Sequence, residues 1–222
     1  MMHFLTFLNN GCVDICRNML TSAERVGFNL NDFTIACLDT ECFDKMKKYP
    51  GCYLHSEQKN TEYQNWSFDP NSGFRTIVKS KWKIIREHYK KHKQLCWVDT
   101  DIVFVKNPLP YIEKNDKILF QCDSPGSLIC SGFMVFNDTQ DCNTMISELG
   151  ENETEDDQIL VNNIVMSKYK SSCALLPIPQ FPNGHMYYSR GIKNEAFIVH
   201  NNHMVGIEEK IRRFKDENLW YI

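Results

Sequence analysis

The stretch Leu95-Cys-Trp-Val-Asp-Thr-Asp101, followed by Ile102-Val-Phe-Val105, decides the fold of this chain. Its apolar first half is typical of a buried strand, and two carboxylates, Asp99 and Asp101, follow directly. In open α/β sheets ligands bind at the carboxyl ends of strands, so a site is expected here. Alternate side chains of an extended segment share one side, and two carboxylates there relieve their repulsion by sharing a divalent cation. An Asp-rich turn is the alternative interpretation.

The composition is that of an ordinary globular protein. The chain has 222 residues, of which 42% are hydrophobic and 24% charged, which suits one substantial α/β domain. No linker or internal repeat divides it, so we expect a single domain over residues 1–222. The net charge of −3 argues against nucleic acid as a partner, because phosphate neutralisation needs a basic face. The basic run 79–93 is interpreted as the solvated face of an amphipathic helix.

Neither a membrane segment nor an export signal is expected. No apolar stretch is long enough to span a bilayer, and the first residues lack the basic region and apolar core of a signal peptide. The ten cysteines are scattered, without a Cys-x-x-Cys pair or zinc spacing. We therefore expect reduced, mostly buried thiols in a cytoplasmic protein.

Strands and helices alternate along the first half of the chain. The expected strands are 4–8, 33–38, 52–55 and 95–98, and the expected helices are 13–26, 41–49 and 74–92, with a long loop over 56–73. This order implies a mostly parallel sheet with right-handed crossovers. In the second half we expect strands at 117–121, 132–137 and 197–200, helices at 139–149, 156–166 and 207–218, and a loop over 177–184. The pattern predicts a nucleotide-binding half, about 1–105, and an acceptor-binding half, about 106–222.

One alternative class fits the same acidic motif. Asp99-Thr-Asp101-Ile-Val103 also resembles the opening motif of haloacid-dehalogenase-like phosphatases, where one Asp is the nucleophile and a second is the acid/base. That motif normally lies on the first strand of its domain, whereas several βα units precede it here. The closing acidic pair of that family should follow an apolar strand, but Asp156-Asp157 follows an acidic stretch. These differences favour another class of enzyme.

The other class is a sugar transferase that uses a nucleotide diphosphate. Such an enzyme needs a Lewis acid to neutralise charge on the departing diphosphate. Carboxylates and an imidazole are suitable ligands for Mn²⁺ or Mg²⁺. The segment 198–210 offers the remaining groups: His200 ends an expected strand, Gly206 permits close backbone approach, and Lys210 lies at the start of the last helix.

Taken in order, these motifs resemble the nucleotide-diphospho-sugar transferases of GT-A fold, of the glycosyltransferase family 77 type. The resemblance runs over nearly the whole chain and includes Arg17-Asn18, Trp97-Val-Asp-Thr-Asp-Ile-Val103, Ser131-Gly-Phe133, Asp157-Gln158, Phe181-Pro-Asn-Gly184 and His200-Asn-Asn202. It implies a single Rossmann-like α/β domain, with a mostly parallel central sheet flanked by helices. It also implies transfer of a hexose-type sugar from a nucleotide diphosphate, UDP first of all, to a glycan or glycoprotein acceptor, with retention.

The resemblance further implies roles for individual residues. The metal, Mn²⁺ or Mg²⁺, would be held by Asp99, Asp101 and His200. Asp101 and Asp157 are the expected catalytic residues. Base and ribose would contact Thr6, Asn9 and Asp39, while Gly206 and Lys210 would hold the diphosphate. The full set of expected donor-binding residues is Thr6, Asn9, Asp39, Lys81, Asp99, Thr100, Gly132, Gln158, Gly206 and Lys210.

Several alternatives stay open at this point. Asp39 could simply begin a turn and Asp157 could cap a helix, and in an inverting reaction Asp157 would be the candidate base. His203 stands where the family has an aromatic residue, so a metal role could shift to it. The loop aromatics either pack the loop or form an acceptor platform; they are Tyr63, Trp66, Phe68 and Phe74.

Two further hypotheses concern the protein as a whole. A binding module that kept the fold and lost catalysis is a third function class. With neither anchor nor signal in the sequence, the chain also resembles the glycosyltransferases that large DNA viruses of algae encode for their capsid glycoproteins.

Overall fold

The computed structural model describes residues 1–222 except 58, 66, 68, 70, 125–127 and 153–155. The first half contains β1 (His3–Leu8), α1 (Val13–Arg25), β2 (Phe33–Cys37), α2 (Thr40–Met46), β3 (Cys52–Leu54), α3 (Gly73–Val78), α4 (Ser80–Tyr89), β4 (Leu95–Val98) and β5 (Ile102–Phe104). The second half contains α5 (Leu109–Ile112), β6 (Ile118–Ser124), β7 (Leu128–Phe136), α6 (Gln140–Glu151), α7 (Asp157–Ile164), β8 (Cys173–Leu175), β9 (Ile198–His200) and α8 (Ile207–Asp216). Short 3-10 turns cover 10–12 and 30–32, and π turns cover 165–169 and 185–189.

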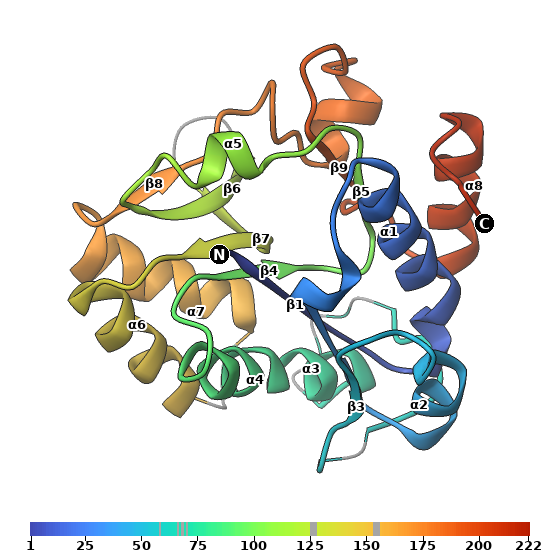
Figure 1. Ribbon diagram of the computed structural model, residues 1–222, viewed down its shortest axis with the longest axis horizontal. Coiled ribbons are helices and arrows are strands. Elements are labelled where there is room, and N and C mark those ends of the chain that lie inside the picture. The colour runs from blue at the N-terminus through green and yellow to red at the C-terminus, as the bar shows by residue number, and fades with distance from the viewer. Residues whose placement is uncertain (58, 66, 68, 70, 125–127, 153–155) are drawn as a thin grey trace.

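The central sheet has the strand order β3-β2-β1-β4-β7-β6-β8. Its first four strands are parallel, β7 runs antiparallel to both of its neighbours, and β8 is parallel to β6. The mostly parallel sheet expected from the sequence is therefore confirmed, and strands from both halves of the chain form it. Helices cover both of its faces (Figure 1). A parallel sheet covered on both faces is buried throughout, and all five residues of β2 are buried accordingly.

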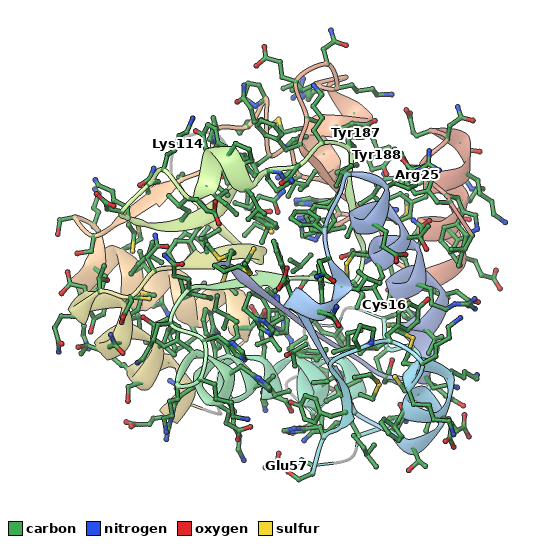
Figure 2. All side chains as sticks on the ribbon, in the orientation of Figure 1. Cys16, Arg25, Glu57, Lys114, Tyr187 and Tyr188 are labelled. Carbon is green, nitrogen blue, oxygen red and sulfur yellow. The ribbon has the colours of Figure 1, made fainter. Side chains whose placement is uncertain are left out.

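Two apolar layers pack the sheet. On one face the core includes side chains of α1 and α2, and on the other it includes side chains of α4, α6 and α7. Side chains fill both layers, with Cys16 of α1 fully buried (Figure 2). All ten cysteines are free thiols, as expected. Among the described residues, no helix has both the length and the apolar character required to cross a bilayer.

A separate two-stranded sheet positions the candidate site. β5 continues the chain directly beyond Asp101 and pairs antiparallel with β9, with Ile102 opposite His200. The backbone N–H of Asn201 donates to the Asp101 carbonyl at 2.9 Å, which extends this pairing to the acidic motif. Two segments about half the chain apart in sequence are thereby fixed side by side.

Several element boundaries differ from those expected. The single helix expected over 74–92 is divided at Lys79 into α3 and α4, and α4 ends at Tyr89. β6 and β7 are longer than expected and form a hairpin, because the cross-strand partner extends each of them. β5 and β8 were not foreseen, since three-residue strands carry almost no periodic signal. Of the loop aromatics, Trp66 and Phe68 lie outside the described residues.

The end of the chain is fixed to the first helix by a buried asparagine. The Asn18 side chain donates from Nδ2 to the Leu219 carbonyl at 2.9 Å and accepts from the Tyr221 N–H at 2.7 Å. Phe214 of α8 packs with Ile15 and Val103 in a small apolar cluster beside it. These contacts hold α8, and with it Lys210, against α1 and β5.

We expect Asn18→Leu to lower the free energy of unfolding by about 2 kcal/mol or more, because it leaves two buried backbone groups without partners. Denaturant unfolding followed by circular dichroism measures this. The control is Asn163→Leu at an exposed position of α7. Equal stability of the two variants would show that the anchor contributes little.

Candidate active site

A cavity of about 680 Å³ opens at the carboxyl ends of β1 and β4. Its wall also includes the start of α7 and the segment between β9 and α8. Most of the residues predicted from the sequence line it, namely Asn9, Lys81, Asp99, Thr100, Asp101, Gly132, Asp157, Gln158, His200 and Lys210. The strand-end rule therefore located the cavity correctly.

Asp101 is the centre of a buried group of charged side chains. One carboxylate oxygen, Oδ2, accepts a hydrogen bond from Lys210 Nζ at 2.6 Å, and the other, Oδ1, lies 3.3 Å from His200 Nε2. Burial disfavours the charged form of Asp101, but Lys210 and His200 outweigh it and hold the pKa of the carboxyl below its usual range. Burial likewise opposes charge on Lys210, yet Asp101 raises the pKa of this lysine above its usual range.

His200 is oriented by a glutamine that the sequence did not single out. Gln121 donates from Nε2 to the Phe181 and Pro182 carbonyls at 3.2 and 3.0 Å, which turns its Oε1 toward His200 Nδ1 at 2.7 Å. An amide oxygen only accepts, so Nδ1 carries the proton and Nε2 faces Asp101. Burial lowers the pKa of the imidazole, but Asp101 and Cys130 outweigh it and raise the pKa to about 10.

Gly132 makes room for this imidazole. A Cβ atom at position 132 would lie 2.1 Å from His200 Cε1, so any side chain would displace the ring. The Gly132 carbonyl also accepts from the Asp99 N–H at 2.8 Å. The glycine thus positions two of the residues expected to bind metal.

Asp99, Asp101 and His200 form a group that fits a divalent cation. One ligand atom from each lies within 4.8 Å of the other two. The orientation of His200, with Nδ1–H held by an amide oxygen and Nε2 turned toward the carboxylate, is the arrangement that metal-binding histidines normally have. Two carboxylates and one imidazole suit Mn²⁺ or Mg²⁺.

A second buried cation connects the acidic motif to α7. Lys81 Nζ lies 2.5 Å from Asp157 Oδ2 and 3.2 Å from Asp99 Oδ1. Ser131 Oγ donates to the same Asp157 oxygen at 2.7 Å. Burial opposes charge on Lys81, but Asp157 and Asp99 raise its pKa above the usual range. The helix cap is Asp156, which accepts from the Gln158 and Ile159 N–H groups, so Asp157 is free of that structural role.

Three of the expected donor-binding residues do not line the cavity: Thr6, Asp39 and Gly206. Thr6 is fully buried within β1. Asp39 caps α2 by accepting from the Cys42 N–H at 2.8 Å and also accepts from the Asn10 N–H at 2.7 Å. Gly206, with φ of +96°, begins α8 between cavity residues. The structure thus supports the turn interpretation of Asp39.

Asn9 reaches the cavity but its amide is engaged elsewhere. Its Nδ2 donates to the Asn60 and Glu62 carbonyls at 2.8 and 2.6 Å. These bonds hold the loop after β3 beside the loop after β1, and Tyr63 and Phe74 of the expected aromatic loop also line the cavity. Asn9 therefore positions a wall of the cavity.

Asp123 is a cavity residue that sequence reasoning missed. It accepts from His203 Nε2 at 3.1 Å and from Gln158 Nε2 at 3.3 Å. The metal-binding group that the described residues form contains His200 and not His203, whose partner is Asp123. Asp123 lies near the end of an expected strand, so the strand-end rule could have found it. Gln121 lies inside a strand and gave no such signal.

The carboxyl ends of the strands thus bring together an acidic motif, an imidazole and two lysines, the groups expected of a nucleotide-sugar transferase. Residues 29–214 match the nucleotide-diphospho-sugar transferase family, and the chain belongs to this family. The family match favours the sugar transferases over the phosphatases, the two enzyme classes considered from the sequence.

Curated relatives match nearly the whole chain. A UDP-galactose:fucoside alpha-3-galactosyltransferase of Dictyostelium discoideum is 26% identical over 96% of this chain and 42% of its own length. A UDP-D-xylose:L-fucose alpha-1,3-D-xylosyltransferase of Arabidopsis thaliana is 22% identical over 99% of this chain and 67% of its own length. The chain thus spans less than half of the first of these proteins.

Solved structures share the fold at low identity. A glycosyltransferase involved in glycosylation of the major capsid of PBCV-1 superposes with a TM-score of 0.60 at 15% identity, over 94% of this chain and 97% of that one. Mouse xyloside xylosyltransferase 1 superposes with a TM-score of 0.57 at 12% identity, over 93% of this chain and 100% of that one. The expected GT-A fold is confirmed.

We expect Gln121→Leu to weaken Mn²⁺ binding about 10- to 100-fold, because it removes the group that fixes the His200 tautomer. Isothermal titration with Mn²⁺ measures this. Gln140→Leu, at an exposed position of α6, is the matched control. Unchanged affinity in Gln121→Leu would contradict the orienting role.

Proposed function

We propose that this protein is a metal-dependent glycosyltransferase that moves a hexose-type sugar from a UDP-sugar to a glycan or glycoprotein acceptor. The observation that carries the proposal is the convergence of Asp99, Asp101, His200 and Lys210 in one cavity. This is the set of groups that a metal-bound diphosphate needs, and residues about half the chain apart supply it. Family membership and the UDP-sugar donors named for the relatives support transfer from a UDP-sugar. The galactose donor of one relative supports a hexose, whereas the other relative is named for xylose, a pentose.

Different residues of the cavity would bind different parts of the nucleotide-sugar. Asp99, Asp101 and His200 would hold Mn²⁺ or Mg²⁺, which when bound supplies Lewis-acid neutralisation of the diphosphate. Lys210 offers an ammonium group to the same phosphates. Asp157 and Gln158 at the start of α7, with Lys81 of α4 paired to Asp157, would bind sugar hydroxyls.

We further propose retention of the anomeric configuration. The relatives' names specify alpha linkages, and UDP-galactose and UDP-xylose are themselves α-linked donors. In the inverting alternative Asp157 would be the base. Its Oδ2, however, already accepts from Ser131 and is paired with Lys81, which supports a sugar-binding role over proton abstraction.

For the acceptor we propose a fucose-containing glycan, because both relatives act on fucose or a fucoside by name. The fold shared with a capsid glycosyltransferase makes a glycoprotein such as a viral capsid protein the second acceptor to test.

The decisive experiment titrates UDP into the protein with and without Mn²⁺, then assays transfer from UDP-galactose and UDP-xylose to a methyl fucoside. Metal-dependent UDP binding and an α-linked disaccharide, identified by NMR, are the expected results. Metal-dependent release of phosphate from phosphomonoesters would favour the phosphatase class. Sugar binding without nucleotide binding would favour the inactive module.

Asp101→Asn should abolish Mn²⁺-dependent UDP binding while the chain stays folded, because the amide keeps the shape and removes the charge. Calorimetry and a thermal melt measure the two properties. Asp216→Asn, at an exposed position of α8, is the control. Wild-type Mn²⁺-dependent affinity in Asp101→Asn would refute the assignment.

A further inference from the structure

We propose that Lys210 competes with the divalent metal for Asp101 and transfers to the diphosphate when a nucleotide binds. This inference rests on the proposed function and adds a coupling between metal binding and nucleotide binding. The protein would bind metal and nucleotide weakly when each is alone and tightly when both are present. The reason is that Lys210 opposes metal binding and supports nucleotide binding.

The first support is the geometry of the pair. Lys210 Nζ bonds Asp101 Oδ2 at 2.6 Å, while the other Asp101 oxygen faces His200. The lysine side chain is 15% exposed and the aspartate side chain 10%. A cation coordinated by Asp101 and His200 thus shares its carboxylate with a buried ammonium group. Like charges at such short range in a poorly solvated site repel strongly.

The second support is the charge of the group. Three carboxylates, those of Asp99, Asp101 and Asp157, are paired with the ammonium groups of two lysines, Lys81 and Lys210. With His200 neutral as a metal ligand, the set carries a single negative charge. A bound divalent cation makes the net charge of this set positive, and a bound diphosphate makes it negative again. Each ligand therefore compensates the charge that the other introduces.

The third support is the difference between the two lysines. Lys81 lies between Asp99 and Asp157 and also donates to the Ser131 carbonyl at 3.3 Å. Among the described residues Lys210 has one carboxylate partner, Asp101, and it lies on the first turn of α8. Its long, rotatable stem can carry the ammonium group from Asp101 to a phosphate nearby. Lys210 is therefore the mobile cation and Lys81 the fixed one.

The test is Lys210→Met, titrated with Mn²⁺ alone and with UDP in saturating Mn²⁺. We expect Mn²⁺ alone to bind at least fivefold more tightly than to the wild type, the lower end of the about 5- to 150-fold coupling usual between sites. UDP should bind at least fivefold more weakly in the same variant. Lys215→Met, exposed on the same helix, should change neither affinity.

Titration at high ionic strength distinguishes direct competition from a long-range effect of the lysine charge on Mn²⁺ affinity. The gain in Mn²⁺ affinity should persist at high ionic strength, because the pair is buried. Lys210→Arg keeps the charge and should leave Mn²⁺ affinity near the wild-type value, and a thermal melt of each variant verifies folding. In the wild type, Mn²⁺ should raise UDP affinity by the same factor that UDP raises Mn²⁺ affinity.

The outcomes distinguish this inference from the proposed function. Weaker UDP binding in Lys210→Met with unchanged or weaker Mn²⁺ binding would overturn the competition and leave the transferase proposal intact. A wild-type protein that binds no UDP in Mn²⁺ would overturn the proposed function itself.

Discussion

A buried carboxylate at position 101 is the constraint on which the rest of the site depends. Removing such a charge from water costs several kcal/mol unless partners compensate it. Much of the surrounding structure supplies those partners: the pairing of β5 with β9 brings His200, the contact of α8 with α1 brings Lys210, and Gly132 leaves space for the imidazole. The same partners keep this carboxylate ionised in the wall of the cavity.

The mostly parallel sheet and the position of the cavity could be predicted from the sequence, because alternating βα units and strand-end carboxylates follow general rules. Asp99, Asp101, His200 and Lys210 were found in this way and through the family resemblance. Gln121 could not be found, since a polar residue inside a buried strand gives no hint of the partner it will meet. Asp39 is also a strand-end acid, and the structure shows it capping α2 with its two oxygens accepting from the Cys42 and Asn10 N–H groups, while its role toward the donor stays a prediction. The sequence did not predict β5, because a three-residue strand shows no periodic pattern, although this strand positions the site.

The two ends of the cavity are built differently. Asp99, Asp101 and His200 lie at the ends of strands β4, β5 and β9. Other parts of the wall come from the start of α7 and the segment between β9 and α8, where Ile159 and Val205 are exposed. Loops tolerate substitution better than strands do. The division suits a family whose relatives here are named for different sugars, galactose and xylose, on related acceptors.

The anchoring of the last residues by Asn18 has a consequence for how the chain reaches its native state. The bond joins residues 201 positions apart, and the Asp101–Lys210 pair spans 109 positions. Contacts of such separation form late, because the closure of long loops costs entropy before any packing compensates it. The βα units of the first half can assemble from local contacts, but Asp101 then faces water without His200 and Lys210. A partly folded intermediate would therefore lack the complete group of charges around Asp101, which forms only when β9 and α8 have docked.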